Sequence, residues 1–116
     1  LVVPLKSVVP RVEDVDIVNG CAFMISAAAV ARVGLVDERF FLIHEESDLC
    51  LRALAAGLRC GVVAETLVWH KGSSSFKRTG SRHQRYYDSR NLNLLLRKHA
   101  RTHLRGRNPA RSWFEY

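Results

Sequence analysis

Short apolar runs alternate with segments of helical character, and this alternation constrains the fold more than any other feature of the chain. Ser26 can cap a helix over 27–33, because its hydroxyl accepts the free amides of the first turn. Gly34 fits the left-handed position that ends such a helix. A second helix is predicted over 46–56, with Gly57 as its stop. The apolar runs around these helices predict strands at 15–18, 21–25, 60–64 and 67–69.

Alternating strands and helices predict an α/β fold. A chain of 116 residues holds one small core, yet the predicted elements are too few for a self-sufficient doubly wound sheet. Residues 1–13, with their two prolines, are expected to be irregular. The sequence also begins at Leu1 rather than at an initiator methionine. We therefore expect a fragment of a longer protein that supplies the second half of a larger sheet.

Basic side chains gather in the second part of the chain. Residues 71–116 carry 12 basic and 2 acidic side chains, whereas residues 1–70 carry 6 basic and 9 acidic ones. We therefore separate a first part, 1–82, from a basic helix and tail, 83–116. The polycationic part favours phosphate-bearing partners, such as a nucleotide, a nucleic acid or anionic lipid, or is simply a solvated tail. Its helix, predicted over 84–103, carries Tyr87, Asn91, Leu94 and Leu95 on one side.

The cysteines argue against a metal cluster or a disulfide scaffold. Cys21, Cys50 and Cys60 are odd in number and widely spaced, whereas metal sites usually show a close pair and secreted scaffolds an even count. We expect three buried or half-buried free thiols in a reducing compartment.

Three carboxylates, Glu45, Glu46 and Asp48, open the second predicted helix. Negative charge is favourable at a helix N-terminus, so an acidic first turn has an ordinary electrostatic explanation. The functional alternative is a general base, since a carboxylate at a strand-to-helix turn can take a proton from a substrate hydroxyl.

His70 follows the last predicted strand and precedes a Gly/Ser-rich basic loop. It is either a hydrogen-bonded side chain or a metal ligand, and an imidazole alone holds Mn²⁺ or Mg²⁺ poorly. A metal site would therefore need carboxylates from elsewhere. The pair Asp14 and Asp16 is interpreted as a coincidence at a strand edge, and His99 and His103 as solvated side chains. The remaining histidines, His44 and His83, have no convincing ligand spacing.

Several motifs occur together in a specific order. They are Val-Asn-Gly-Cys-Ala-Phe-Met-Ile at 18–25, Val-Gly-Leu-Val-Asp-Glu-Arg-Phe-Phe at 33–41, His-Glu-Glu-Ser-Asp-Leu-Cys-Leu-Arg at 44–52 and Val-Trp-His-Lys-Gly-Ser-Ser at 68–74. With the later Tyr-Tyr and Arg-Asn pairs, this order resembles the C-terminal half of a family-two glycosyltransferase, and the rhamnosyltransferase-like branch in particular. The resemblance covers roughly residues 15–98.

The resemblance implies a GT-A fold, with a mixed sheet flanked by helices, and inversion at the anomeric carbon. It implies that Glu46 is the general base, with Glu45 and Asp48 as the flanking acids, and the base assignment stays open between Glu46 and Glu45. It implies that His70 binds a divalent metal, Mn²⁺ or Mg²⁺, completed by carboxylates outside this chain. Substrate-binding residues would be Gly20, Arg52, Trp69, Lys71 and Arg90.

The partners implied are a nucleotide-diphosphate sugar donor and a glycan or lipid-linked acceptor. The basic helix would sit against anionic lipid, which implies a cytoplasmic location at the inner face of the cell membrane. The family's donor-binding Asp-x-Asp finds no match here, so the chain alone should be inactive. Its core residues should also remain partly exposed. A basic nucleic-acid-binding module over 71–116 is the alternative, but the order of motifs over 18–72 favours the transferase. The core residues expected are Val18, Phe23, Ile25, Phe41 and Leu49.

Overall fold

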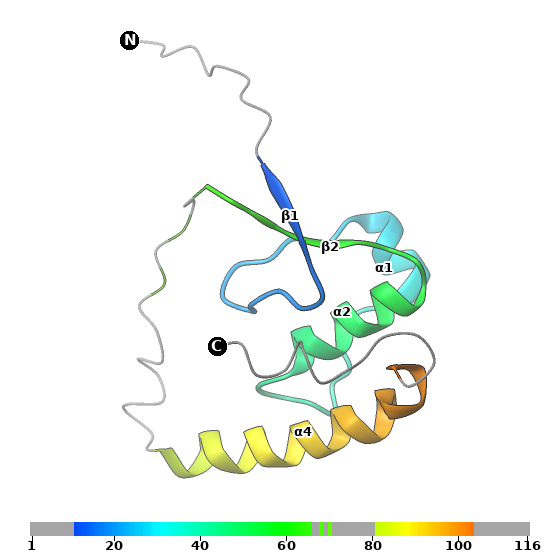
Figure 1. The fold of residues 1–116 in the computed structure, drawn as a ribbon. Coiled ribbons are helices and arrows are strands. Elements are labelled where there is room, and N and C mark those ends of the chain that lie inside the picture. Colours follow the sequence, from blue (N-terminus) through cyan, green and yellow to red (C-terminus); the bar gives the residue numbers. More distant parts are fainter. Residues whose placement is uncertain (1–10, 66–67, 69, 71–80, 104–116) are drawn as a thin grey trace.

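The computed structural model describes residues 11–65, 68, 70 and 81–103, and these residues form a small mixed α/β arrangement. In chain order the elements are β1 (Val12–Val15), α1 (Ala27–Val33), α2 (Glu45–Ala55), β2 (Cys60–Val63) and α4 (Ser81–His103). Two strands pair into an antiparallel sheet, α2 lies beside it, and α1 and α4 pack on α2 (Figure 1). The α/β class predicted from the alternation of elements is therefore confirmed.

The two strands differ in how well the sequence predicted them. β2 lies where the sequence places it, but β1 begins at Val12, inside the segment expected to be irregular, rather than at Val15. Pairing decides the position, because Val12 lies opposite Val63 and Val15 opposite Cys60. The strand predicted at 21–25 is wrong: this segment is irregular, and Met24 is 98% exposed. Within the described ranges, this segment pairs with neither β1 nor β2.

The two short helices form as predicted, because their end signals are local. The Oγ atom of Ser26 accepts a hydrogen bond from the amide of Ala29 at 3.1 Å, which satisfies one free donor of α1. Gly34 follows with a positive φ of 77°, which glycine adopts without strain. Gly57 likewise follows α2 with a positive φ, of 75°. α2 starts one residue earlier than predicted, at Glu45.

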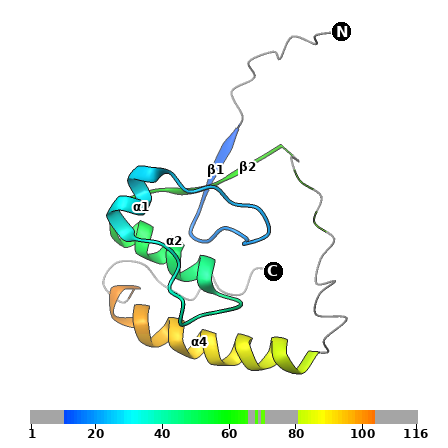
Figure 2. The ribbon, with the colours of Figure 1, turned by 180° about the vertical axis from the view of Figure 1, so that it is seen from behind.

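The core lies between α2 and α4. Phe40, Leu51 and Leu95 are almost completely buried and form one apolar cluster. Figures 1 and 2 show α4 running along one side of α2, with β1 and β2 on the other side. α4 begins at Ser81, three residues before the predicted start, and presents Asn91 and Leu95 to the interior. None of the helices in the described ranges combines the length and the apolarity that crossing a bilayer needs.

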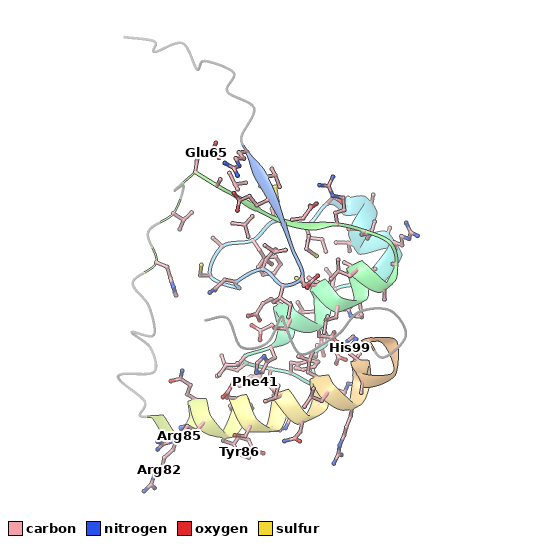
Figure 3. All side chains as sticks on the ribbon, in the orientation of Figure 1. Phe41, Glu65, Arg82, Arg85, Tyr86 and His99 are labelled. Atoms are coloured by element: carbon pink, nitrogen blue, oxygen red, sulfur yellow. The ribbon has the colours of Figure 1, made fainter. Side chains whose placement is uncertain are left out.

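Several side chains expected in the core are exposed. Leu49 is buried as expected, but Phe23 is 44% exposed and Phe41 is 75% exposed. Phe41 instead packs its ring against Tyr87, with 5.4 Å between ring centroids. His99, expected to be solvated, is only 7% exposed, since it lies between α4 and α2 (Figure 3). These corrections follow from the packing of α4 on α2, which a single helix pattern does not reveal.

Three further predictions concern the cysteines, the strand at 67–69 and the Gly/Ser-rich loop. Cys50 is buried and Cys60 half-buried, as expected for free thiols, but Cys21 is exposed because its segment forms no strand. The strand predicted at 67–69 falls largely outside the described residues, and Val68 itself is exposed and not in a strand. The Gly/Ser-rich loop also lies outside the described residues as far as 80.

Candidate functional site

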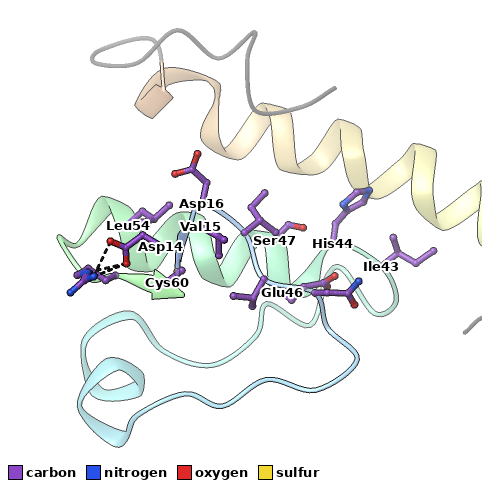
Figure 4. Close-up of a pocket in the computed structure, with 13 residues that line it drawn as sticks. Asp14, Val15, Asp16, Ile43, His44, Glu46, Ser47, Leu54 and Cys60 are labelled. Atoms are coloured by element: carbon purple, nitrogen blue, oxygen red, sulfur yellow. Dashed lines mark hydrogen bonds and ion pairs between the residues drawn. The ribbon is translucent and has the colours of Figure 1, made fainter. Parts of the chain in front are cut away.

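A pocket of about 880 Å³ opens between the end of β1 and the first turn of α2 (Figure 4). One part of the wall is the segment from Asp14 to Asn19, and another comes from Ile43, His44, Glu46 and Ser47. The wall residues shown in the close-up include Asp16, His44 and Glu46. The pocket is lined by Asp14, Val15, Asp16, Ile17, Val18, Asn19, Ile43, His44, Glu46, Ser47, Leu54, Arg59 and Cys60.

Glu46 is the acidic residue of the predicted run that reaches this pocket. Burial raises the pKa of its carboxyl group above the ordinary value, and the neighbouring charge of Glu45 raises it further. His44 and the backbone of Gly20 act in the opposite direction but do not cancel the rise. A carboxylate with a raised pKa in a pocket is a candidate proton acceptor.

Gly20 is brought directly against Glu46. A Cβ atom at position 20 would lie 3.1 Å from the Cδ atom of Glu46 and 3.3 Å from its Oε1 atom. Such contacts are tighter than side chains normally make, so glycine allows the backbone to approach the carboxyl group. Of the residues predicted to bind substrate that the structure describes, Gly20 is therefore the one that lies against the predicted base.

An unusual loop carries the chain into α2. Phe41, Ile43 and His44 have φ values of 58°, 68° and 71°, a left-handed region that costs a non-glycine residue on the order of 1 kcal/mol or more. The amide group of Asn91, buried on α4, holds this loop. Its Nδ2 atom lies 2.6 Å from the carbonyl oxygen of Leu42 and 2.8 Å from that of Ile43.

His44 joins the pocket to α4. His44 is the residue that precedes α2, and the Nε2 atom of its ring lies 3.1 Å from Oδ1 of Asp88 on α4. No role was predicted for His44, because no ligand spacing surrounds it. Its left-handed backbone belongs to the loop before α2, which no sequence pattern indicated. Asn91 was visible as a polar residue on an apolar helix side, which is a usable signal for a buried anchor.

Asp48 does not reach the pocket. It is completely buried against α4, where His99 Nε2 lies 2.7 Å from Oδ1 and Lys98 Nζ lies 2.8 Å from the same oxygen. Burial alone would raise the pKa of Asp48, but the hydrogen bonds from Lys98, His99 and Arg52 together lower it below the ordinary value. Its carboxylate is held ionised between the two helices.

Arg52 and Arg90 are likewise engaged with protein groups. The guanidinium of Arg52 donates to Asp48 at 2.9 Å, to the carbonyl of Leu35 at 2.6 Å and to the carbonyl of Val33. It therefore ties α2 to the chain that leaves α1. Arg90 donates from Nη1 to the carbonyl of Arg39 at 2.9 Å and to Oδ1 of Asn91 at 2.6 Å. Neither arginine lines the pocket.

Glu45, the other candidate base, is not among the residues that line the pocket. Its Oε2 atom is buried and, within the part of the chain that the structure describes, accepts no hydrogen bond. The geometry therefore separates the two neighbouring carboxyl groups, with Glu46 facing the pocket and Glu45 turned from it.

The predicted metal ligand stands apart from this pocket. His70 is exposed, and among the described residues no group of three or more His, Cys, Asp or Glu side chains is arranged to hold a metal ion. The described residues therefore do not fit a metal site by themselves. Trp69 and Lys71, predicted to bind substrate, lie outside the described residues.

The Asp14 and Asp16 pair has separate roles. Asp14 forms a two-pronged ion pair with Arg59, whose Nη2 atom lies 2.8 Å from each carboxylate oxygen (Figure 4). Asp16 lines the pocket together with Glu46.

Cys60 lines the same pocket, and burial raises the pKa of its thiol to about 11, with a further contribution from Cys50.

Comparison with known proteins identifies the family. The model of glycosyl transferase family group 2 matches residues 5–114, so the chain belongs to this family of sugar transferases. Two curated relatives are a dTDP-rhamnosyl transferase, RfbF, from Shigella flexneri and a low-salt glycan biosynthesis hexosyltransferase, Agl10, from Haloferax volcanii. The resemblance to rhamnosyltransferase-like members of family two is thereby confirmed.

These relatives are considerably longer than the chain. RfbF is 34% identical over 82 residues, which cover 65% of this chain and 28% of RfbF. Agl10 is 30% identical over 81 residues, which cover 70% of this chain and 26% of Agl10. The chain thus spans about a quarter of the length of the curated relatives it matches. No solved structure matches the chain significantly.

Proposed function

We propose that this chain is the C-terminal, acceptor-side part of a GT-A glycosyltransferase that transfers a sugar from a nucleotide-diphosphate donor to an acceptor hydroxyl with inversion. The observation that carries the proposal is Glu46: in a chain of this family, a half-buried carboxyl group with a raised pKa lies on a pocket wall. The 1–82 part would hold the acceptor and the base, and the 83–116 part would support it. The donor-binding half would lie outside this chain.

The chemistry assigned to Glu46 is general-base catalysis. An acceptor alcohol is a poor nucleophile until its proton is removed. As the acceptor oxygen bonds to the anomeric carbon, its proton passes to the Glu46 carboxylate, and the bond between that carbon and the phosphate oxygen breaks. The nucleotide diphosphate leaves with the electron pair. Attack from the face opposite the leaving group inverts the anomeric centre.

Glu46 is a better candidate than Glu45 for this role. Glu46 lines the pocket, whereas Glu45 does not. Burial also raises the pKa of Glu46, which makes its ionised form a stronger base than an ordinary glutamate. Asp48 is held between Lys98, His99 and Arg52, so we propose that it supports α2 rather than meeting substrate.

His70 is proposed as one ligand of a divalent metal, Mn²⁺ or Mg²⁺, with carboxylates outside this chain as the others. Its exposure leaves the imidazole accessible. A metal bound there would help neutralise the charge of the departing diphosphate. The proposed substrate-binding residues remain Gly20, Arg52, Trp69, Lys71 and Arg90. Among those that the structure describes, Gly20 alone lies against Glu46.

The outer side of α4 supports a proposed contact with anionic lipid, where a lipid-linked acceptor would reside. Figure 3 shows Arg82, Arg85 and Tyr86 on the side of α4 that faces away from α2. Basic and apolar side chains together suit a headgroup surface. This contact would place the enzyme on the cytoplasmic face of the membrane, in envelope glycan or glycolipid synthesis. Further along the helix, Leu92, Leu96 and Arg97 are also exposed.

The test is a pair of matched substitutions in the full-length transferase. E46Q is expected to lower kcat by about 10²–10⁴-fold while donor binding stays nearly unchanged, because only the proton acceptor is lost. E45Q is the matched control and should retain most of the activity, since Glu45 does not line the pocket. If E46Q keeps more than about a third of wild-type kcat and E45Q does not, the base is Glu45.

A further inference from the structure

We propose that Asn91 of α4 is a positioning residue that sets where Glu46 lies in the pocket, acting through the loop 40–44. The inference rests on the proposed role of Glu46 as the base. It concerns a residue far along the chain, 48 positions from the nearest carbonyl that it binds, that of Ile43.

The side chain of Asn91 is fully buried, and its polar atoms are directed to this loop and its surroundings. The Nδ2 amino group lies 2.6 Å from the carbonyl oxygens of Phe40 and Leu42 and 2.8 Å from that of Ile43, so its two hydrogens are shared among three acceptors. The Oδ1 atom accepts from Arg90, which itself also binds the carbonyl of Arg39. One side-chain amide therefore binds three carbonyl groups of a five-residue loop.

The loop needs such an anchor. Phe41, Ile43 and His44 all have left-handed backbone conformations, which bulky side chains rarely adopt and which persist only when surrounding contacts fix them. The three carbonyls held by Asn91 precede or lie within this left-handed run. Without the amide donors, the loop would relax toward ordinary conformations.

A change in the conformation of the loop would displace Glu46. His44 is the residue before α2, and its carbonyl accepts the first helical hydrogen bond, from the amide of Asp48 at 3.0 Å. A shift at His44 therefore moves the first turn of α2. Glu46 fits closely against Gly20, so even a small displacement would change this contact and the burial of the carboxyl group.

The groups around Glu46 define what a pH experiment would report. His44 and Glu45 are the titratable neighbours on its own segment. The charged and titratable groups across the pocket are Asp14, Asp16, Arg59 and Cys60. Within the described residues, none of these groups forms a hydrogen bond with Asn91, so a substitution at Asn91 acts on Glu46 through the backbone of the loop.

The experiment compares N91A with N93A in the full-length transferase. Asn93 is the matched control, because it is exposed on the same helix and, within the described ranges, its side chain donates only to the carbonyl of Ser89, at 2.8 Å. N91A is expected to lower kcat by about tenfold to a hundredfold, with the donor KM within about twofold, because the base is misplaced rather than lost. The acid limb of the pH profile of kcat/KM should also move to lower pH, since Glu46 becomes more exposed. N93A should change neither.

A second variant covers the case in which N91A does not fold. Adding I43G gives one of the three left-handed positions a residue that adopts this conformation freely, so N91A/I43G should fold. Phe41 and His44 stay left-handed and the three carbonyls still lack the Asn91 donor, so the loss of kcat and the pH shift should persist. If the folded variants kept the kcat and the pH midpoint of the wild type, the inference would be overturned. Failure of both variants to fold would also overturn it, because it would mean a purely structural role.

The outcomes also separate this inference from the proposed function. If E46Q abolishes transfer while folded N91A keeps the wild-type pH midpoint, the base assignment stands and the positioning role falls. If E46Q is fully active, the base assignment itself falls, and with it this inference.

Discussion

Glu46 is a carboxyl group whose charged form the fold disfavours. Burial raises its pKa, so the folded protein binds a proton at Glu46 more readily than the unfolded chain does. The stability that this group contributes is therefore present below its unfolded pKa and is lost as pH rises through the raised folded pKa. The ionised Glu46 carboxylate thus lowers the stability of the fold at neutral pH.

This predicts opposite effects of one substitution on stability and on activity. E46Q should raise the melting temperature at neutral pH, because the buried charge is removed, and the difference should vanish below pH 4.5. Thermal unfolding of E46Q and wild type across this pH range checks the expectation. E45Q is the comparison. A lower melting temperature for E46Q at neutral pH would show that the ionised carboxyl group makes stabilising contacts.

The wild-type enzyme should itself show a pH-dependent rate set by Glu46. Because the base acts only when ionised, kcat/KM is expected to rise with pH through a pKa above 4.5. The measurement is a pH profile with saturating metal and a neutral acceptor. An acid limb at or below the value of an ordinary glutamate would contradict the raised pKa.

His70 carries a separate prediction at the residue scale. In the full-length transferase, H70A should shift the titration of activity with Mn²⁺ or Mg²⁺ to higher metal concentration, because one ligand is lost. H83A is the matched control, since His83 is an exposed histidine on α4. An unchanged midpoint for H70A would mean that the imidazole does not bind the metal.

At the scale of elements, Asp48 holds α2 and α4 together. It accepts hydrogen bonds from Lys98 and His99 of α4 and from Arg52 of its own helix. Lys98 also reaches Asp37 at 2.7 Å, and the hydrogen bonds from Arg39 and Lys98 keep the pKa of Asp37 well below its usual range. One lysine therefore links the turn before Phe40 to both helices.

Removing the Asp48 charge should be costly. D48N is expected to destabilise the protein by about 3 kcal/mol, because partly buried cationic partners lose their counter-charge. D14N is the matched control and should cost less than about 1 kcal/mol, since the Asp14–Arg59 pair is mostly exposed. Urea denaturation measures both. Equal effects of the two substitutions would mean that the buried position adds nothing.

The elements also show which predictions a sequence can support. Both short helices were placed within a residue, because Ser26, Gly34 and Gly57 act on backbone groups a few positions away. β1 was misplaced, because a strand is defined by a partner that lies far along the chain. Glu46 was found through the order of motifs, whereas the turn of Asp48 toward α4 depends on helix packing that no local pattern encodes.

At the scale of the whole molecule, the described residues leave much apolar surface uncovered. Leu35 is 68% exposed and Phe41 75%, while few apolar side chains are fully buried. Both edges of the two-stranded sheet also lack a further strand within the described ranges. Exposed apolar side chains and open strand edges favour association with another surface.

The chain prepared alone is therefore expected to be marginally stable and to self-associate. It should show no transfer from a nucleotide sugar, because the donor-binding part proposed to lie elsewhere is missing. Size-exclusion chromatography and a transferase assay measure both properties, with the full-length protein as the positive control. A stable monomer that transfers sugar by itself would overturn the proposed division of the active site.

The exposed Cys21 makes the pocket accessible to spectroscopy without any engineered residue. Its amide binds Oδ1 of Asn19 at 3.1 Å, in the turn that also holds Gly20 against Glu46. Cys50 is buried, and the Cys60 thiol, with a pKa of about 11, stays protonated at neutral pH and reacts slowly. A maleimide dye or nitroxide should therefore attach first at Cys21, where its signal would follow an acceptor sugar entering beside the carboxyl group.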